Sequence, residues 1–185
     1  MATIAIIGDG PGGLSAALFI ARAGHHVTVY GADQTVMHYA FLNNYLGIDA
    51  ISGTDFQTAA RQQVLNAGAA ISEENVTGVV ITGGGVEVTT ETGTAPADFL
   101  VLGEGKQMPL ANSLGIQTTH GEDEIVAVDR NGKTAIDTVY VIGRSARPTR
   151  SQAIISAGDG AAAALDILSR IEGKDVQDWD SPPKE

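Results

Sequence analysis

The amino-acid sequence predicts an α/β fold of three layers, with a central parallel sheet and a small antiparallel meander. Two apolar runs, Thr3–Ile7 and Asp98–Leu102, each end in glycine, which is typical of parallel strands buried on both faces. A glycine-rich turn joins the first run to a helix. Two further runs, rich in valine and threonine and separated by a Thr-Gly-Gly-Gly turn, predict an antiparallel hairpin.

The first unit of the chain is expected to be a strand, a glycine turn, a helix and a second strand. The strand Thr3–Ile7 leads into the turn Gly8–Gly13. Apolar residues over Leu14–Ala23 predict a helix that Gly24 ends. The second strand is His26–Tyr30. This order within roughly 30 residues is typical of a dinucleotide-binding unit.

The middle of the chain is expected to be irregular over Gly31–Gly53 and then helical. Thr54 or Asp55 is placed to cap a helix that runs to Asn66. The strands expected after this helix are Ala69–Ser72, the hairpin pair Val76–Ile81 and Val86–Thr92, and then Asp98–Leu102.

The last third of the chain contains two short strand candidates, Ile125–Val128 and Val139–Ile142. A long helix is predicted over Ser151–Ile171, with Ser151 as its cap and Gly173 as its stop. We expect one domain over residues 1–173, followed by a polar and flexible tail over residues 174–185.

Composition excludes several classes of protein and of site. The 185 residues are 43% hydrophobic and carry a net charge of -11, which supports a folded core and argues against nucleic acid as a partner. No apolar run is long enough to span a membrane, and no basic leader precedes the strand at Thr3, so we expect a cytoplasmic protein. The absence of cysteine excludes a dithiol redox centre within this chain, and the histidines show no metal-ligand spacing, so no metal site is expected.

Gly8, Gly10 and Gly13 form a G-x-G-x-x-G motif between a strand and a helix. The first glycine allows a tight turn, the second lets the backbone approach a pyrophosphate, and the third lets the helix pack closely on the strand. The alternative is a turn that serves packing alone. An acidic residue is expected near the end of the second strand to bind a ribose, and Asp33 is the nearest carboxylate. Backbone groups alone, with Asp33 as a solvated loop residue, are the alternative.

Four segments resemble the FAD-binding domain of the thioredoxin reductase family. They are IAIIGDGPGGLSAALFIARAG, NNYLGIDAISGTDF, ADFLVLGEG and IDTVYVIGRSARPTRSQAIISAGDGAAAALDIL, and the match extends from about Ala2 to Ile171. The resemblance implies an FAD/NAD(P)-binding Rossmann-like fold. In the family, an NADPH-binding domain with a Cys-x-x-Cys centre is inserted in the middle, where this chain has a short bridge from Gly105 to about Gly121.

The resemblance also shows where the cofactor site departs from the family. Gly143-Arg144 stands where the family has Gly-Asp, and Gly103-Glu104-Gly105 stands where it has Ala-Thr-Gly. Ser151-Gln152-Ala153 keeps the Gln-Ala half of an Arg-Gln-Ala segment. The residues that the motif and the resemblance together assign to FAD are Gly8, Gly10, Pro11, Gly12, Gly13, Gly31, Asp33, Thr35, Asn44, Val76, Gly103, Gly105, Gly143, Arg144, Ser151, Gln152 and Ala153.

Three arginines precede the last helix. Arg144 is expected to pair with the pyrophosphate, because a guanidinium offers forked donors. Arg147 and Arg150 are candidates for an anionic substrate or a partner protein, and the alternative for all three is pairing with surface carboxylates. The helix near Ser151 is expected to point its N-terminus at the flavin, and Asn44 to lie near the flavin ring. His38 and Tyr39 either reach this ring or pack as ordinary loop residues.

The function that the resemblance implies is electron transfer by bound FAD with a separate donor protein or reduced cofactor. No side chain stands out as a catalytic acid, base or nucleophile. Family members form homodimers through this domain, so a homodimer is expected. The alternatives are a non-catalytic nucleotide-binding or regulatory module that has altered or lost FAD binding, and the FAD subunit of a split reductase whose NADPH domain is another polypeptide.

Overall fold

The structure, a computed structural model, describes residues 1–118 and 125–178. Its central sheet contains β1 (Thr3–Ile7), β2 (His26–Tyr30), β5 (Ala70–Ser72), β9 (Phe99–Leu102) and β10 (Val139–Val141). All of their pairings are parallel, and the order across the sheet is β10-β9-β1-β2-β5. The sequence predicted these five strands to within one residue at each end.

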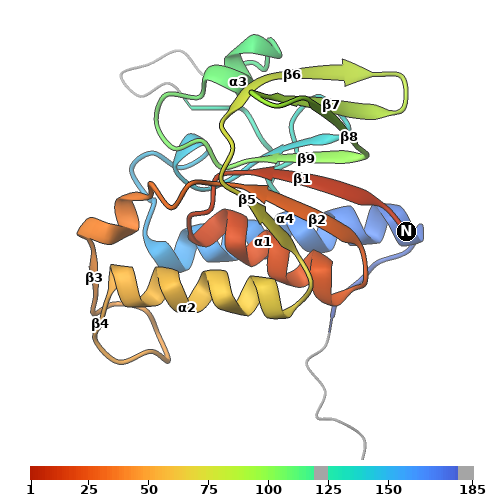
Figure 1. The fold of residues 1–185 in the computed structure, drawn as a ribbon. Coiled ribbons are helices and arrows are strands. Elements are labelled where there is room, and N and C mark those ends of the chain that lie inside the picture. The colour runs from red at the N-terminus through yellow and green to blue at the C-terminus, as the bar shows by residue number, and fades with distance from the viewer. Residues whose placement is uncertain (119–124, 179–185) are drawn as a thin grey trace, which may run out of the picture.

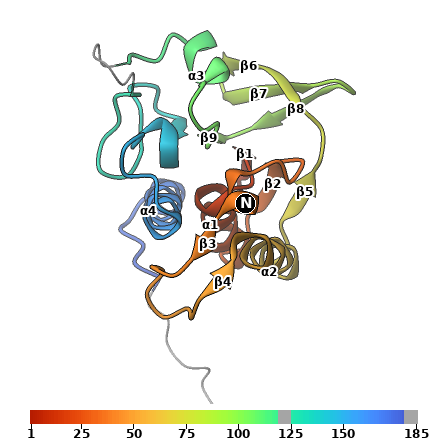
Figure 2. The ribbon, with the colours of Figure 1, turned by 90° about the vertical axis from the view of Figure 1, so that its left-hand side faces the viewer.

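The helices α1 (Pro11–Arg22), α2 (Gly53–Asn66) and α4 (Ala153–Glu172) cover one face of this sheet (Figure 1). The other face carries a three-stranded antiparallel sheet and the short helix α3 (Pro109–Ser113) (Figure 2). The arrangement of helices, parallel sheet and antiparallel sheet confirms the predicted three-layer α/β class.

The antiparallel sheet consists of β6 (Val76–Thr82), β7 (Gly85–Thr90) and β8 (Thr94–Ala97), paired in that order. The first two strands form the predicted hairpin. The third strand was not predicted as a separate element, because Pro96 interrupts its pattern. Proline is compatible with β8 because this strand lies at an edge of the sheet.

Two helices begin at other residues than the sequence indicated. Helix α1 starts at Pro11 rather than Leu14, because proline fits the first position of a helix. Helix α2 starts at Gly53, and its cap is Ser52 rather than Thr54 or Asp55. The Ser52 hydroxyl accepts a hydrogen bond from the Asp55 amide at 3.1 Å.

The segment that was expected to be irregular contains the 3₁₀ turn η1 (Val36–Tyr39) and a two-stranded ribbon of β3 (Phe41–Leu42) and β4 (Ile51–Ser52). A second 3₁₀ turn, η2 (Gly143–Ser145), follows β10. The predicted bridge between the two halves of the domain contains the unexpected helix α3.

The expected strand Ile125–Val128 is not present, because only Val126 pairs, in an isolated bridge to Thr118. The expected cap Ser151 is also wrong. Helix α4 begins one residue later than a Ser151 cap requires, and its capping residue Gln152 makes no side-chain hydrogen bond to the helix.

The predicted tail is only partly described. Its amide at Val176 donates to the Ser169 hydroxyl at 2.9 Å, so the first residues after α4 fold back on this helix. Residues 179–185, with Trp179, lie outside the described part, as does Gly121 at the end of the bridge. Within the described part, no helix combines the length and apolarity needed to cross a bilayer.

Helix α4 is fixed to the rest of the molecule by two kinds of contact. A Cβ on Gly160 would overlap the carbonyl oxygen of Gly12, so α4 and α1 pack backbone against backbone. The buried Tyr140 hydroxyl of β10 donates to Asp166 of α4 at 2.5 Å. Burial, followed by the Asp166 contact, raises the pKa of Tyr140, so this tyrosine stays protonated as a donor. The N-terminus of α4 is thereby held beside the glycine turn.

Candidate functional site

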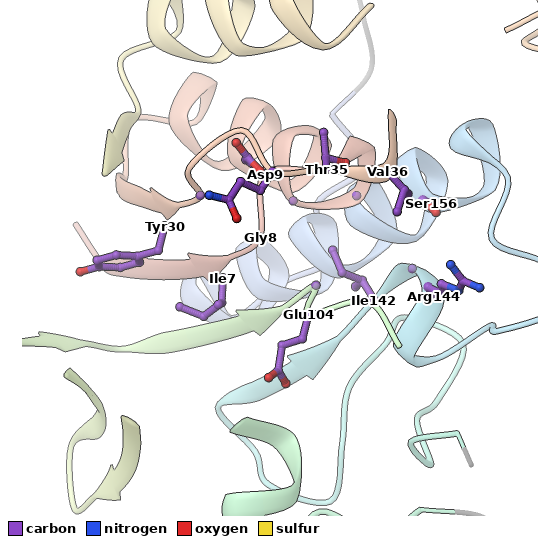
Figure 3. Close-up of a pocket in the computed structure, with 18 of the residues that line it drawn as sticks. Ile7, Gly8, Asp9, Tyr30, Thr35, Val36, Glu104, Ile142, Arg144 and Ser156 are labelled. Carbon is purple, nitrogen blue, oxygen red and sulfur yellow. The ribbon is translucent and has the colours of Figure 1, made fainter. Parts of the chain in front are cut away.

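A cleft of about 830 Å³ opens at the carboxyl ends of the parallel strands (Figure 3). Ligands of open α/β sheets bind at this edge. The wall comes from four parts of the chain: the glycine turn, residues 30–37, residues 103–110, and residues 142–156, with 74–76 at one end. The volume lies in the upper part of the range of small-molecule sites, roughly 300–1,000 Å³.

The glycine turn forms one side of the cleft. Gly8 has a φ of +100°, and its amide donates to the Tyr30 carbonyl at 2.8 Å, which ties the turn to β2. Gly10 is the capping residue of α1 and offers no side chain, and Pro11 has no N–H. The amides of Gly12 and Gly13, in the first turn of α1, are therefore available to an anion. A Cβ on Gly13 would overlap the Gly8 carbonyl oxygen, so this turn requires glycine there.

A second helix N-terminus faces the same cleft. Ser151 and Ala153 of the α4 entry lie on its wall, and no side chain caps this helix. Ser156, one turn into α4, also lies on the wall and is 9% exposed. Because two helices direct free N–H groups at one space, the cleft favours a ligand with two separate sites of negative charge or hydrogen-bond acceptance.

The two ends of the cleft differ in chemistry. Figure 3 shows Tyr30 at one end and Arg144 with Ser156 at the other. Burial, and secondarily the nearby charge of Glu74, raises the pKa of Tyr30, so this end presents a neutral phenol. The other end is cationic, because Arg144 is exposed on the wall and no described carboxylate pairs with it.

The three arginines of the loop have three different environments. Arg144 lies on the cleft. Arg147 instead pairs with Asp159 of α4, with a nitrogen–oxygen distance of 2.8 Å. Arg150 is exposed, and within the described residues its guanidinium donates only to the neighbouring carbonyl of Thr149, at 3.4 Å. The Ser145 hydroxyl donates to the Gly105 carbonyl at 2.7 Å and joins this loop to the loop after β9.

Glu104 lies on the wall, but Figure 3 shows its carboxylate directed away from the glycine turn. It accepts hydrogen bonds from the amides of Leu110 (2.8 Å) and Ala111 (3.0 Å) in α3. Burial raises the pKa of Glu104, and these two bonds oppose that effect. Its clearest role is to hold the start of α3.

Most of the residues assigned to FAD from the sequence meet on this cleft. They are Gly8, Gly10, Pro11, Gly12, Gly13, Gly31, Thr35, Val76, Gly103, Gly105, Gly143, Arg144, Ser151 and Ala153. Asp33, Asn44 and Gln152 do not line it. Asn44 donates to Gln152 across 3.1 Å, so the loop between β3 and β4 is tied to the N-terminus of α4.

The sequence did not assign a number of residues that line the cleft, among them Asp9, Tyr30, Glu74, Lys106, Ile142 and Ser156. Asp9 lies inside the glycine motif and Ile142 directly precedes Gly143, so adjacency was the available signal. Nothing in the local sequence connects Glu74 or Lys106 to the turn. His38 and Tyr39 are not on the wall, and His38 instead contacts Asp33 and Thr54.

Comparison with known proteins shows which family and which fold this chain resembles. Residues 2–53 match the model of the pyridine nucleotide-disulphide oxidoreductase family. No curated protein sequence matches the chain.

Solved structures show the same fold over nearly the whole chain. A thioredoxin reductase from Gloeobacter violaceus superposes with a TM-score of 0.85 at 16% identity, over 97% of this chain and 99% of that one. The atypical thioredoxin reductase TRi from Desulfovibrio vulgaris Hildenborough gives 0.78 at 18%, over 94% and 99%. A ferredoxin-flavin thioredoxin reductase from Clostridium acetobutylicum gives 0.77 at 18%, over 93% and 98%. The chain therefore has the fold of the thioredoxin reductases, as the resemblance of its segments implied.

Proposed function

We propose that this chain is an FAD-binding domain that takes part in oxidoreduction with a separate electron donor. One observation carries the proposal: the N-termini of α1 and α4, neither capped by a side chain, face a single cleft, and the glycine turn on its wall leads directly into α1. FAD has two matching features, a central pyrophosphate and a flavin ring with hydrogen-bond acceptors at one edge. The match of residues 2–53 and the fold of the thioredoxin reductases support the same assignment.

The residues present fit two parts of the cofactor, the pyrophosphate and the flavin ring. The amides of Gly12 and Gly13 are placed to bind the pyrophosphate, and Arg144 adds a positive charge to the same cleft. The N-terminus of α4 stabilises negative charge at the flavin end. The flavin, when bound, supplies the redox chemistry, and the protein supplies binding, orientation and electrostatics.

Both redox partners belong to other molecules in this proposal, because the chain contains no cysteine for a dithiol centre and has a short bridge where the family has its NADPH-binding domain. A reduced cofactor or a donor protein delivers the electrons. A single domain over residues 1–173, a homodimer through this domain and a cytoplasmic location are part of the same proposal. They rest on the resemblance and on composition.

A second candidate is a nucleotide-binding module that does not use flavin. Arg144 and Glu104 favour it, since the family has Asp and an Ala-Thr-Gly segment at these places. The FAD subunit of a split reductase is a variant of the first candidate, with the nicotinamide domain on another polypeptide.

Flavin retention separates these candidates. The purified protein is incubated with FAD, passed through a desalting column in buffers of low and high salt, and its visible spectrum is recorded. We expect a retained flavin band. A colourless protein that binds ADP in the same buffers would contradict the first candidate and support the second.

A further inference from the structure

The side chain of Asp9 lies in the space that a side chain on residue 31 would otherwise fill. A Cβ placed on Gly31 would overlap the Asp9 carboxyl group and lie 2.8 Å from its Oδ1 atom. Gly31 directly follows the last residue of β2, and both Asp9 and Gly31 line the cleft. The carboxylate therefore reaches the end of β2 from the glycine turn, 22 positions earlier in the chain.

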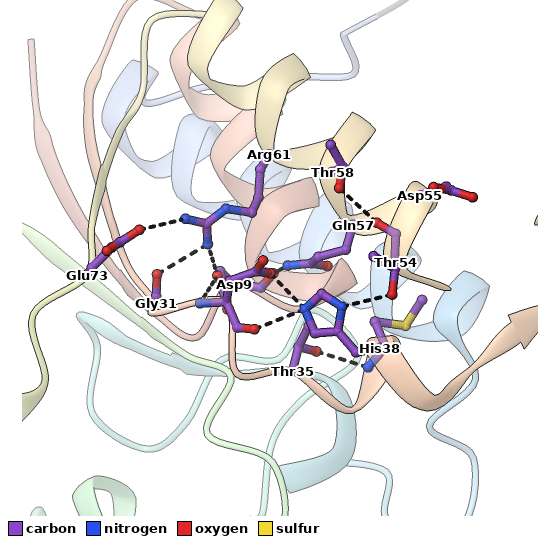
Figure 4. Close-up of polar contacts among 12 residues, drawn as sticks. Asp9, Gly31, Thr35, His38, Thr54, Asp55, Gln57, Thr58, Arg61 and Glu73 are labelled. Carbon is purple, nitrogen blue, oxygen red and sulfur yellow. Dashed lines mark hydrogen bonds and ion pairs between the residues drawn. The ribbon is translucent and has the colours of Figure 1, made fainter. Parts of the chain in front are cut away.

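Two groups bond this carboxylate, and a third bonds the main-chain carbonyl of the same residue (Figure 4). The Arg61 guanidinium of α2 bonds Asp9 Oδ2 and also the Gly31 carbonyl, at 3.2 Å for the latter. The Asp33 amide donates to the same Oδ2 at 3.0 Å. Gln57, fully buried on α2, donates to the Asp9 carbonyl at 2.6 Å. The bonds from Arg61 and the Asp33 amide fix the rotamer of Asp9. Arg61 also compensates the negative charge of this residue, which is only 5% exposed and therefore needs a partner.

The other oxygen, Oδ1, accepts no hydrogen bond from any described residue. It lies beside Gly31, at the end of the second strand, where dinucleotide-binding folds place the carboxylate that binds the ribose. Asp33, the nearest acid in the sequence after β2, does not line the cleft. Its carboxylate contacts His38 Nε2 at 3.1 Å.

We propose that Asp9, and not Asp33, is the carboxylate that accepts the ribose hydroxyls of the adenosine half of the ligand. Arg61 acts as a positioning residue, since it touches Asp9 and not the ribose. This inference rests on the proposed nucleotide-binding function of the cleft. It assigns a specificity role to a residue that the glycine motif leaves variable.

The test compares ADP with 2′,3′-dideoxy-ADP by isothermal titration on the full chain. The wild type is expected to bind ADP about tenfold more tightly, as a hydrogen bond to a charged acceptor implies. Asp9→Ala is expected to bind both nucleotides within about twofold of each other. Asp33→Ala, the matched control, is expected to keep the wild-type preference.

A double variant covers the case in which Asp9→Ala fails to fold because Arg61 loses its partner. In Asp9→Ala/Arg61→Met no unpaired buried charge remains, and the same loss of preference is expected. Equal binding of both nucleotides by the wild type would overturn this inference alone, as would a preference that survives in the Asp9 variants. Failure of the wild type to bind ADP at all would overturn the proposed function with it.

Discussion

Arg144 and Arg150 are exposed in the same loop, yet only Arg144 lies on the wall of the cleft. We predict that Arg144→Ala weakens FAD binding by about tenfold, since the α4 end of the cleft loses its exposed positive charge toward an anionic ligand. Arg150→Ala is the control and is expected to change the dissociation constant less than about twofold. Fluorescence titration of both variants measures this. Equal losses would show that the loop acts only through its overall charge.

The raised pKa of Glu104 predicts how the stability of the protein depends on pH. Its pKa is raised above the usual 4.5 by burial, so the folded state binds this proton more tightly than the unfolded state. The contribution of Glu104 to stability is therefore largest below pH 4.5 and declines as the pH rises through the raised folded value. Glu104→Gln is expected to lack this decline, so the difference in melting temperature between the two proteins is expected to change with pH. Melting temperatures of both proteins from pH 4 to 8 provide the measurement, and parallel profiles would contradict the prediction.

At the scale of elements, the site depends on how closely α4 approaches α1. Gly160 of α4 has no room for a Cβ beside Gly12, whereas Gly158 of the same helix is exposed with open space around it. We predict that Gly160→Ala lowers the free energy of unfolding by about 2 kcal/mol through overpacking. Gly158→Ala is expected to raise it by up to about 1 kcal/mol through helix propensity. Urea denaturation of both variants tests this pair, and a neutral Gly160→Ala would show that the two helices can separate.

The sequence predicted the elements whose signals are local. Continuous apolar runs identified the parallel strands, and the glycine spacing identified the turn. It failed where tertiary contacts decide the outcome: β8 pairs along β7 in spite of Pro96, and Ile125–Val128 finds only one bridge partner. It also failed at α3, because Glu104 supplies the hydrogen bonds that start this five-residue helix.

For the site, the motif and the resemblance predicted most of the wall, since both concern backbone that approaches a phosphate. They could not reveal that Asp9 takes the position of a side chain at residue 31. That arrangement depends on Arg61 and Gln57, which are about 50 residues away in α2 and carry no motif of their own.

At the scale of the whole molecule, the central claim is that both halves of one dinucleotide bind in a single cleft, between two helix N-termini that are more than 140 residues apart in the chain. Isothermal titration of the wild type with FAD, ADP and FMN tests this claim most directly. We predict one FAD per chain, bound at least about tenfold more tightly than ADP or FMN alone, because each half contacts its own helix. FAD that binds no more tightly than ADP would contradict the claim, since the α4 end of the cleft would then contribute nothing to recognition.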